Sequence, residues 1–168
     1  MGNPSLYIAS PLGFSEAGRF FYEKCILPDV RKIGFDILDP WALTDKKLFT
    51  DAFAFPFGPL QKAALARVNQ IAGRNNEEAI RAGTMMLAIL DGPDVDSGTA
   101  SEIGFAAGLV KPIIGYRGDF RLSSDNIGST VNLAVERFIT ICGGSIFTTW
   151  EETRGILYAR YFGYKATA

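Results

Sequence analysis

Residues 85–104 read MMLAILDGPDVDSGTASEIG, and this stretch decides the fold. A short, wholly apolar run that ends in an acidic, glycine-containing turn is typical of a buried parallel strand that enters a helix. In open α/β sheets, ligands bind at the carboxyl ends of such strands. Here that end carries three aspartates, followed by Glu102 in the first turn of the expected helix. Because neighbouring carboxylates repel one another, the cluster indicates a functional site.

The rest of the chain alternates short apolar strands with helical patterns. The predicted strands are residues 6–9, 35–38, 85–90, 111–116 and 145–148. The predicted helices are one that begins at Ser15 and restarts at Pro28, then 60–81 with an interruption near Gly73, 99–110, 132–141 and 150–162. This alternation predicts an α/β fold, a doubly wound five-stranded parallel sheet in the flavodoxin-like order 2-1-3-4-5.

Residues 42–59 interrupt the alternation, because they are rich in phenylalanine and show weak periodicity. We expect a long irregular excursion that covers the strand ends as a lid. No repeat or interdomain linker appears, so residues 1–168 are expected to form a single domain.

The predicted strand order brings two segments to one crevice. In that order, the ends of strands 6–9 and 85–90 flank the point where the order of the strands reverses. Residues 7–14 and 91–102 should therefore face each other across this crevice.

The composition of the 168-residue chain narrows the classes of function. Its formal charge is −1, without a basic cluster, so it does not attract nucleic acid or an anionic membrane surface. The N-terminus lacks the pattern of a signal peptide, and no apolar run approaches the roughly 18 residues of a membrane helix. Cys25 and Cys142 lack a metal-ligand or CxxC spacing and are expected to be reduced core thiols. A soluble, cytoplasmic protein is expected.

The chain contains no histidine. This excludes Ser-His-Asp and Cys-His catalysis, and it excludes zinc held by histidine. Any acid–base or covalent chemistry must therefore come from carboxylates and tyrosines.

Two interpretations of Glu102 are open from the residues alone. Thr99-Ala100-Ser101-Glu102 fits the capping box, in which a glutamate reaches back to the backbone N–H of the cap residue. Alternatively, the helix dipole keeps the carboxylate ionised as a nucleophile. The small residues Gly98, Ala100 and Gly104 would leave room for a ligand beside it.

The aspartates Asp91, Asp94 and Asp96 are either turn formers or ligand-binding groups. Carboxylates suit Mg²⁺, but no glycine-rich phosphate loop accompanies them. Ser97-Gly98-Thr99 could hold a phosphate at the start of the helix, although the adjacent aspartates would repel it. A neutral ligand that is rich in hydroxyl groups is therefore favoured.

Several further side chains are candidates, each with a purely structural alternative. Tyr7 either packs in the core or donates its hydroxyl to a carboxylate across the crevice. Phe14 and Trp41 follow the first two strands, where they are either core residues or the two walls of a sandwich around a planar base. Asn132 could simply cap a helix, and residues 75–78 could simply be a solvated helix face.

Taken together, these segments resemble the nucleoside 2-deoxyribosyltransferase family. The matching segments, in the family's order, are Leu6–Phe14, Leu38–Trp41, Asp94–Ala107, Gly115–Asp119 and Val131–Leu133. The stretch around Ser101-Glu102-Ile103-Gly104 is the most specific. The resemblance implies a flavodoxin-like fold that uses no cofactor and no metal. It also implies exchange of the base of a 2′-deoxyribonucleoside for a free nucleobase, as in nucleotide salvage.

The resemblance implies roles for residues that would act on the sugar. Glu102 would be the nucleophile that attacks C1′ and forms a deoxyribosyl-enzyme ester, and Tyr7 would orient it. Asp96 and Asn132 match the positions that bind the 5′-hydroxyl of the sugar. In the family this asparagine serves the site of a neighbouring subunit, which implies a homo-oligomer.

The resemblance also implies a base site, with two departures. Phe14 and Trp41 would line it, although better-known members have a polar residue at the position of Trp41. Members often use an aspartate to handle the proton of the leaving base, and the nearest matches here are Asn76 and, with a shift of one residue, Glu77. Since Asn76 is not an acid, the proton could come from Glu77, a nearby aspartate or water.

Two other functions compete with base exchange. A hydrolase of nucleosides or deoxynucleoside 5′-monophosphates could use the same glutamate and let water resolve the intermediate. A noncatalytic nucleotide-sensing module is the other alternative, since a fold alone does not establish a function.

Overall fold

The computed structural model describes residues 2–121 and 127–167. Its centre is a five-stranded sheet in which every neighbouring pair of strands is parallel. The strand order is β2-β1-β3-β4-β5, which confirms the predicted flavodoxin-like order. The strands are β1 (Ser5–Ala9), β2 (Asp36–Leu38), β3 (Met85–Ile89), β4 (Ile113–Tyr116) and β5 (Ile146–Phe147).

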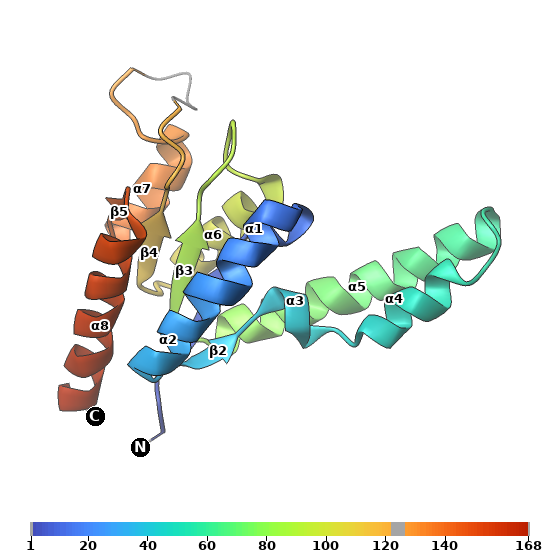
Figure 1. The fold of residues 1–168 in the computed structure, drawn as a ribbon, viewed down its shortest axis with the longest axis horizontal. Coiled ribbons are helices and arrows are strands. Elements are labelled where there is room, and N and C mark those ends of the chain that lie inside the picture. The colour runs from blue at the N-terminus through green and yellow to red at the C-terminus, as the bar shows by residue number, and fades with distance from the viewer. Residues whose placement is uncertain (1, 122–126, 168) are drawn as a thin grey trace.

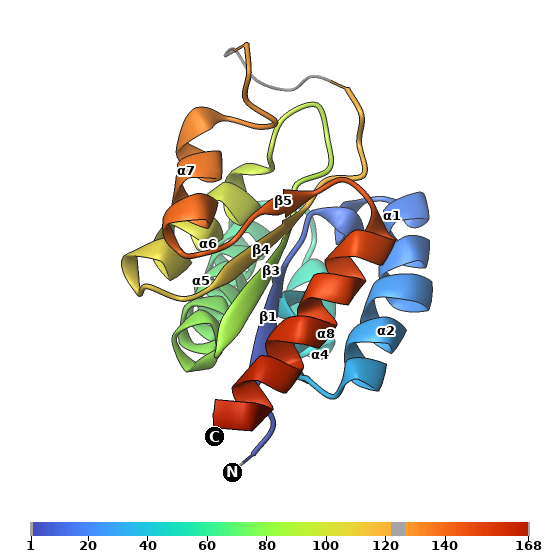
Figure 2. The same cartoon turned by 90° about the vertical axis from the view of Figure 1, so that its left-hand side faces the viewer.

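Helices cover both faces of the sheet, as a doubly wound fold requires (Figure 2). One face is covered by α1 (Glu16–Phe21), α2 (Leu27–Ile33) and α8 (Trp150–Thr167). The other is covered by α5 (Pro59–Ala82), α6 (Ser97–Gly108) and α7 (Leu133–Ile141). Each layer buries its own hydrophobic cluster against the sheet. All five residues of β3 are buried, because this strand lies in the middle of the sheet.

The helix after β1 changes its winding as it approaches Pro28. The chain passes from a 3₁₀ turn, η1 (Leu12–Phe14), into α1, then into a π-helical turn, η2 (Tyr22–Ile26), and then into α2. Proline has no backbone N–H to donate and clashes with the preceding turn of a regular helix. The change of winding therefore falls where the sequence predicted a restart, and Pro28 lies in the first turn of α2.

The expectation that residues 42–59 are irregular is wrong. This segment is mostly helical and contains the second half of α3 (Pro40–Leu43) and all of α4 (Lys46–Phe53). Aspartates start both helices, since the carboxylates of Asp39 and Asp45 accept hydrogen bonds from first-turn backbone N–H groups. Helix α4 packs against α5, and the pair extends away from the sheet as a hairpin (Figure 1).

Helix α5 is continuous, whereas the sequence predicted an interruption near Gly73. A glycine inside a helix costs about 1 kcal/mol relative to alanine, which the remaining turns of a long helix can absorb. As a result, a single helix runs from the tip of the hairpin, where it packs against α4, to the sheet, where it contacts β1. Within residues 2–121 and 127–167, none of the helices has the length and apolar character needed to cross a membrane.

Candidate active site

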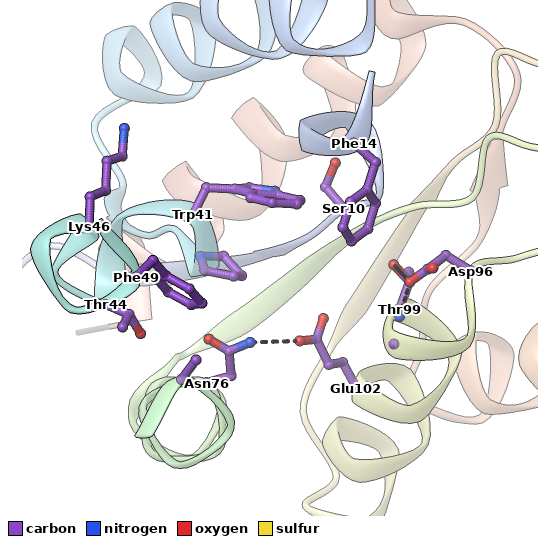
Figure 3. Close-up of a pocket in the computed structure, with 13 residues that line it drawn as sticks. Ser10, Phe14, Trp41, Thr44, Lys46, Phe49, Asn76, Asp96, Thr99 and Glu102 are labelled. Atoms are coloured by element: carbon purple, nitrogen blue, oxygen red, sulfur yellow. Dashed lines mark hydrogen bonds between the residues drawn. The ribbon is translucent and has the colours of Figure 1, made fainter. Parts of the chain in front are cut away.

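A cleft of about 540 Å³ opens beside the carboxyl ends of β1, β2 and β3 (Figure 3). The strand order creates this position, because the crossovers from β1 and β3 leave the sheet on opposite faces. Residues of η1, α3, α4, α5 and α6 meet here with residues of the three loops that follow β1, α3 and β3. The lining residues are Ser10, Phe14, Pro40, Trp41, Thr44, Lys46, Phe49, Ala72, Asn76, Asp96, Gly98, Thr99 and Glu102.

Glu102 and Tyr7 form a hydrogen-bonded pair at the floor of the cleft. The hydroxyl of Tyr7 donates to Oε1 of Glu102 at 2.7 Å. Tyr7 is fully buried on β1, opposite Met86 of β3, and Glu102 reaches it from α6. The structure therefore brings together the two residues to which the sequence assigned the central chemistry.

Asn76 approaches the same carboxylate from α5. Its side-chain amide donates to Oε1 of Glu102 at 3.3 Å, the oxygen that also accepts from Tyr7 (Figure 3). Among the described residues, no group donates to Oε2 of Glu102. One oxygen of the carboxylate is thus held by two donors, while the other is available to a ligand in the cleft.

The capping-box interpretation of Glu102 is wrong. Helix α6 begins at Ser97, two residues before the expected start, and its cap is Asp96. Oδ2 of Asp96 accepts from the backbone N–H of Thr99 at 3.0 Å. Since Asp96, three residues before Thr99, already caps the helix, Glu102 lies beyond the first N–H groups and turns toward β1 and α5 instead.

Burial is the main electrostatic influence on the pair. It raises the pKa of Glu102 above its usual value, and the nearby charge of Asp96 acts in the same direction. The hydrogen bonds from Tyr7 and Asn76 lower that pKa and so oppose the effect. Burial, together with the carboxylate of Glu102, raises the pKa of Tyr7 far above its ordinary value. Tyr7 therefore stays protonated and donates its hydrogen bond throughout the neutral range.

The three aspartates after β3 have separate positions. Asp91 accepts from the backbone N–H of Asp119, and Asp94 accepts from the N–H of Val95, so both shape the loop. Of the three, only Asp96 lines the cleft. The structure thus separates Asp91 and Asp94 from Asp96, the aspartate of the three that lines this cleft.

Aromatic rings form the side of the cleft opposite Glu102 (Figure 3). Phe14 and Trp41 lie 4.9 Å apart between ring centroids, with their planes at 82°. This edge-to-face contact differs from the expected sandwich of two parallel rings around a base. Phe49 of α4 is a further aromatic wall residue that the sequence did not predict.

Besides the buried Tyr7, which reaches the site through Glu102, two predicted site residues do not line this cleft. Glu77 points away from it and pairs with Arg81, one helical turn later, at 2.9 Å on a half-exposed surface. Asn132 caps α7 by accepting from the N–H of Ala134 at 2.9 Å. It lines a second groove, between α6 and α7, together with residues such as Ser101 and Phe138.

The hairpin supplies the lining residues that the sequence did not predict. Thr44, Lys46 and Phe49 belong to the segment that was expected to be irregular, and Ala72 lies one turn before Asn76 on α5. A signal was available, because an aspartate directly before Pro40 and another before Lys46 are typical helix starts.

Comparison with known proteins agrees with this architecture. Solved structures with similar folds include a 2-deoxyribosyltransferase from Bacillus psychrosaccharolyticus, with 20% identity, a TM-score of 0.62, and coverage of 89% of this chain and 90% of that one. A 2-desoxiribosyltransferase from Leishmania mexicana has 22% identity, a TM-score of 0.61, and coverage of 93% and 97%. A CMP N-glycosidase from Clostridium botulinum has 17% identity, a TM-score of 0.54, and coverage of 91% and 96%. At these identities the likeness establishes the fold alone.

A search of curated proteins finds no match to this chain. A family model described as nucleoside 2-deoxyribosyltransferase, however, matches residues 6–134. This range includes β1 except its first residue, all of β2 to β4, all residues that line the cleft, and the start of α7. The chain therefore belongs to the nucleoside 2-deoxyribosyltransferase family.

Proposed function

We propose that this protein transfers the 2-deoxyribosyl group of a nucleoside from one nucleobase to another through an ester on Glu102. The observation that carries the proposal is the asymmetry of the Glu102 carboxylate. Tyr7 and Asn76 hold Oε1, while Oε2 is available in a cleft that can admit a nucleoside. A carboxylate held in one orientation beside a bound sugar is the arrangement that nucleophilic glycosyl transfer requires.

In the first step, Oε2 of Glu102 attacks C1′ of the sugar. The C1′–O bond to the enzyme forms as the C1′–N bond to the base breaks, and the electron pair of that bond leaves with the base, which takes up a proton. In the second step, a ring nitrogen of another base attacks C1′ and loses its proton to solvent. The C1′–O ester bond breaks at the same time, and its electron pair returns to the carboxylate of Glu102. Two displacements at C1′ retain the configuration of the nucleoside.

The proton for the leaving base has few sources in this site. Asn76 is an amide and Glu77 lies outside the cleft, so neither delivers a carboxylic proton to the base. Asp96 lines the cleft but is proposed below to bind the 5′-hydroxyl of the sugar, so we assign this proton to water that enters the cleft. Asn76 would then keep Glu102 in place and would not act as an acid.

The cleft favours a nucleoside over a nucleoside phosphate. Asp96 occupies the start of α6, where a phosphate would otherwise find backbone N–H groups, and its charge would repel that phosphate. The same carboxylate can accept a hydrogen bond from a sugar hydroxyl, which supports the proposed contact between Asp96 and the 5′-hydroxyl. Phe14, Trp41 and Phe49 offer an apolar surface to the base.

Asn132 has a proposed role only in an assembly of two or more chains. It does not line the cleft of its own chain, and it lies at the start of α7, whose exposed side includes Leu133, Phe138 and Ile141. An apolar face of this kind is suited to burial against a second copy. We therefore propose a homo-oligomer in which Asn132 contributes to the sugar site of a neighbouring subunit.

A hydrolase on the same scaffold is the second candidate, because a CMP N-glycosidase from Clostridium botulinum shares the fold. Incubation with 2′-deoxyinosine, with and without adenine, separates the two functions by chromatography. We expect 2′-deoxyadenosine when adenine is present, and none with the Glu102→Gln variant. Release of hypoxanthine and free deoxyribose alone would identify a hydrolase. Binding without turnover would identify a sensing module.

A further inference from the structure

Trp41 forms one wall of the cleft, and its orientation is set by its surroundings. A Cβ atom on Gly13 would lie 2.3 Å from Cε2 of the indole, so the backbone of η1 packs directly against the ring. The ring also makes an edge-to-face contact with Phe14. The indole N–H is buried and has no hydrogen-bond partner among the described residues. No hydrogen bond therefore anchors the indole ring. The position of the Trp41 backbone then helps to determine where the ring lies.

Asp39 holds that backbone position. It follows β2 directly, and its Oδ1 accepts from the N–H of Trp41 at 3.0 Å. This contact starts α3 and fixes the direction in which Trp41 leaves the sheet. Since α3 has only four residues, it has little helical structure of its own to maintain that direction.

Tyr22 holds Asp39 in turn. Its hydroxyl donates to the same Oδ1 at 2.8 Å, and its side chain is 3% exposed. Tyr22 is the first residue of the π-helical turn η2, a kind of irregularity that is frequent at functional sites. Burial and the charge of Asp39 raise the pKa of Tyr22 far above its ordinary value, so the hydroxyl remains a donor.

We infer that Tyr22 and Asp39 are positioning residues that hold Trp41 against Gly13 and thereby shape one wall of the binding cleft. Neither residue lines the cleft, so both act through Trp41. The assignment of this wall to the nucleobase rests on the proposed function, whereas the chain of contacts from Tyr22 to Trp41 does not. Residues near β2 would then determine how tightly a base is held.

The Tyr22→Phe variant tests this role kinetically. We expect KM for the nucleoside and for the acceptor base to rise about fivefold, the factor that corresponds to a hydrogen bond of ordinary strength, while kcat changes less than about twofold. Tyr161→Phe is the matched control, because that hydroxyl donates to Asn3 at 3.4 Å and the residue does not line the cleft. Equal KM values in the two variants would overturn the inference.

A second measurement does not depend on activity. The protein contains two tryptophans, Trp41 and Trp150, which 5-fluorotryptophan labelling resolves as two ¹⁹F NMR signals. The loss of one signal in Trp41→Phe assigns it. We expect the Trp41 signal to shift and broaden in Tyr22→Phe and in Asp39→Ala, while the Trp150 signal stays in place.

The conservative variant Asp39→Asn completes this test, because its amide oxygen can still accept from both donors. We expect its Trp41 signal to stay close to that of the unmodified protein. An unchanged Trp41 signal in both Tyr22→Phe and Asp39→Ala would show that the contacts serve stability alone, and would overturn the inference. If the unmodified protein transferred no deoxyribose, the proposed function would fail and the NMR result would still decide the role of Tyr22.

Discussion

The molecule contains two tyrosine–carboxylate pairs of similar geometry and different surroundings. Tyr7 donates to Glu102 at 2.7 Å, and Tyr22 donates to Asp39 at 2.8 Å. The second donor to Glu102 is a side-chain amide, and the free oxygen of that carboxylate faces the cleft. The second donor to Asp39 is a backbone N–H that starts a helix. A tyrosine–carboxylate contact is therefore not a sign of catalysis by itself. What distinguishes Glu102 is that its second carboxylate oxygen faces the cleft.

The largest expected effect is the loss of transfer in Glu102→Gln. The amide keeps the shape of the side chain but cannot form the ester, so we expect kcat/KM to fall by roughly four orders of magnitude or more. The equivalent change in the other pair, Asp39→Asn, should leave kcat nearly unchanged. Initial rates of base exchange measure both. Comparable losses in the two variants would mean that the pairs do not differ in function.

The stability of Glu102→Gln provides the control for folding. Burial raises the pKa of Glu102, so the folded state binds its proton more tightly than the unfolded state does. This contribution to stability is present below the unfolded pKa and is lost as pH rises through the folded pKa. We therefore expect the variant to be at least as stable as the unmodified protein at neutral pH, with a smaller difference in acid, as measured by urea denaturation.

Tyr7→Phe should have the next largest effect, and it should act on kcat. A hydrogen bond to a charged group contributes about 1.5–3 kcal/mol, so we expect a loss of about 10- to 100-fold. The hydrogen bond from Tyr7 lowers the pKa of Glu102, so its removal raises that pKa further. The acid limb of the pH–rate profile should then move to higher pH. An acid limb that did not move would separate Tyr7 from the ionisation of Glu102.

Asp96 combines the features of both pairs, because it caps a helix and lines the cleft. Asp96→Asn keeps a good capping residue and removes the charge, whereas Asp96→Ala removes both. We expect only the alanine variant to lose about 1 kcal/mol of unfolding free energy. Both should raise KM for the nucleoside by about tenfold, the loss of one hydrogen bond to a charged group. An unchanged KM in Asp96→Asn would exclude contact between this carboxylate and the sugar.

Glu77→Gln should have the smallest effect. Glu77 pairs with Arg81 on an exposed helix surface and does not line the cleft. We expect kcat/KM to stay within about twofold and stability to change by no more than about 0.5 kcal/mol. A large loss of kcat would show that Glu77 reaches the leaving base when substrate is bound, and that it belongs to the active site.

The sheet and the Tyr7–Glu102 pair could be predicted because their signals are local. Apolar runs such as 85–90 end in polar turns, and their alternation with helices favours the strand order that the structure has. Once the order is known, residues after β1 and β3 must face each other. Family resemblance added the chemistry of Glu102, and the match over residues 6–134 confirms that resemblance.

The parts that were missed depend on contacts between distant residues. The S/T-x-x-E pattern at Thr99 matches a known capping motif, but the helix starts earlier in the sequence, with Asp96 as its cap. The periodicity of residues 42–59 is too weak to predict α4, which is stabilised by packing against α5. The role of Asn76 as a donor to Glu102 also depends on that long helix, since the two residues meet only after the fold is complete.

The central claim is that Glu102 carries the sugar between the two steps. Incubation with 2′-deoxyinosine without an acceptor base, followed by acid quenching, proteolysis and mass spectrometry, tests it directly. The account predicts that the peptide containing Glu102 gains the mass of one deoxyribosyl group, and that Glu102→Gln yields no such peptide. Transfer that continues with the group on another residue, or without any adduct, would contradict the account.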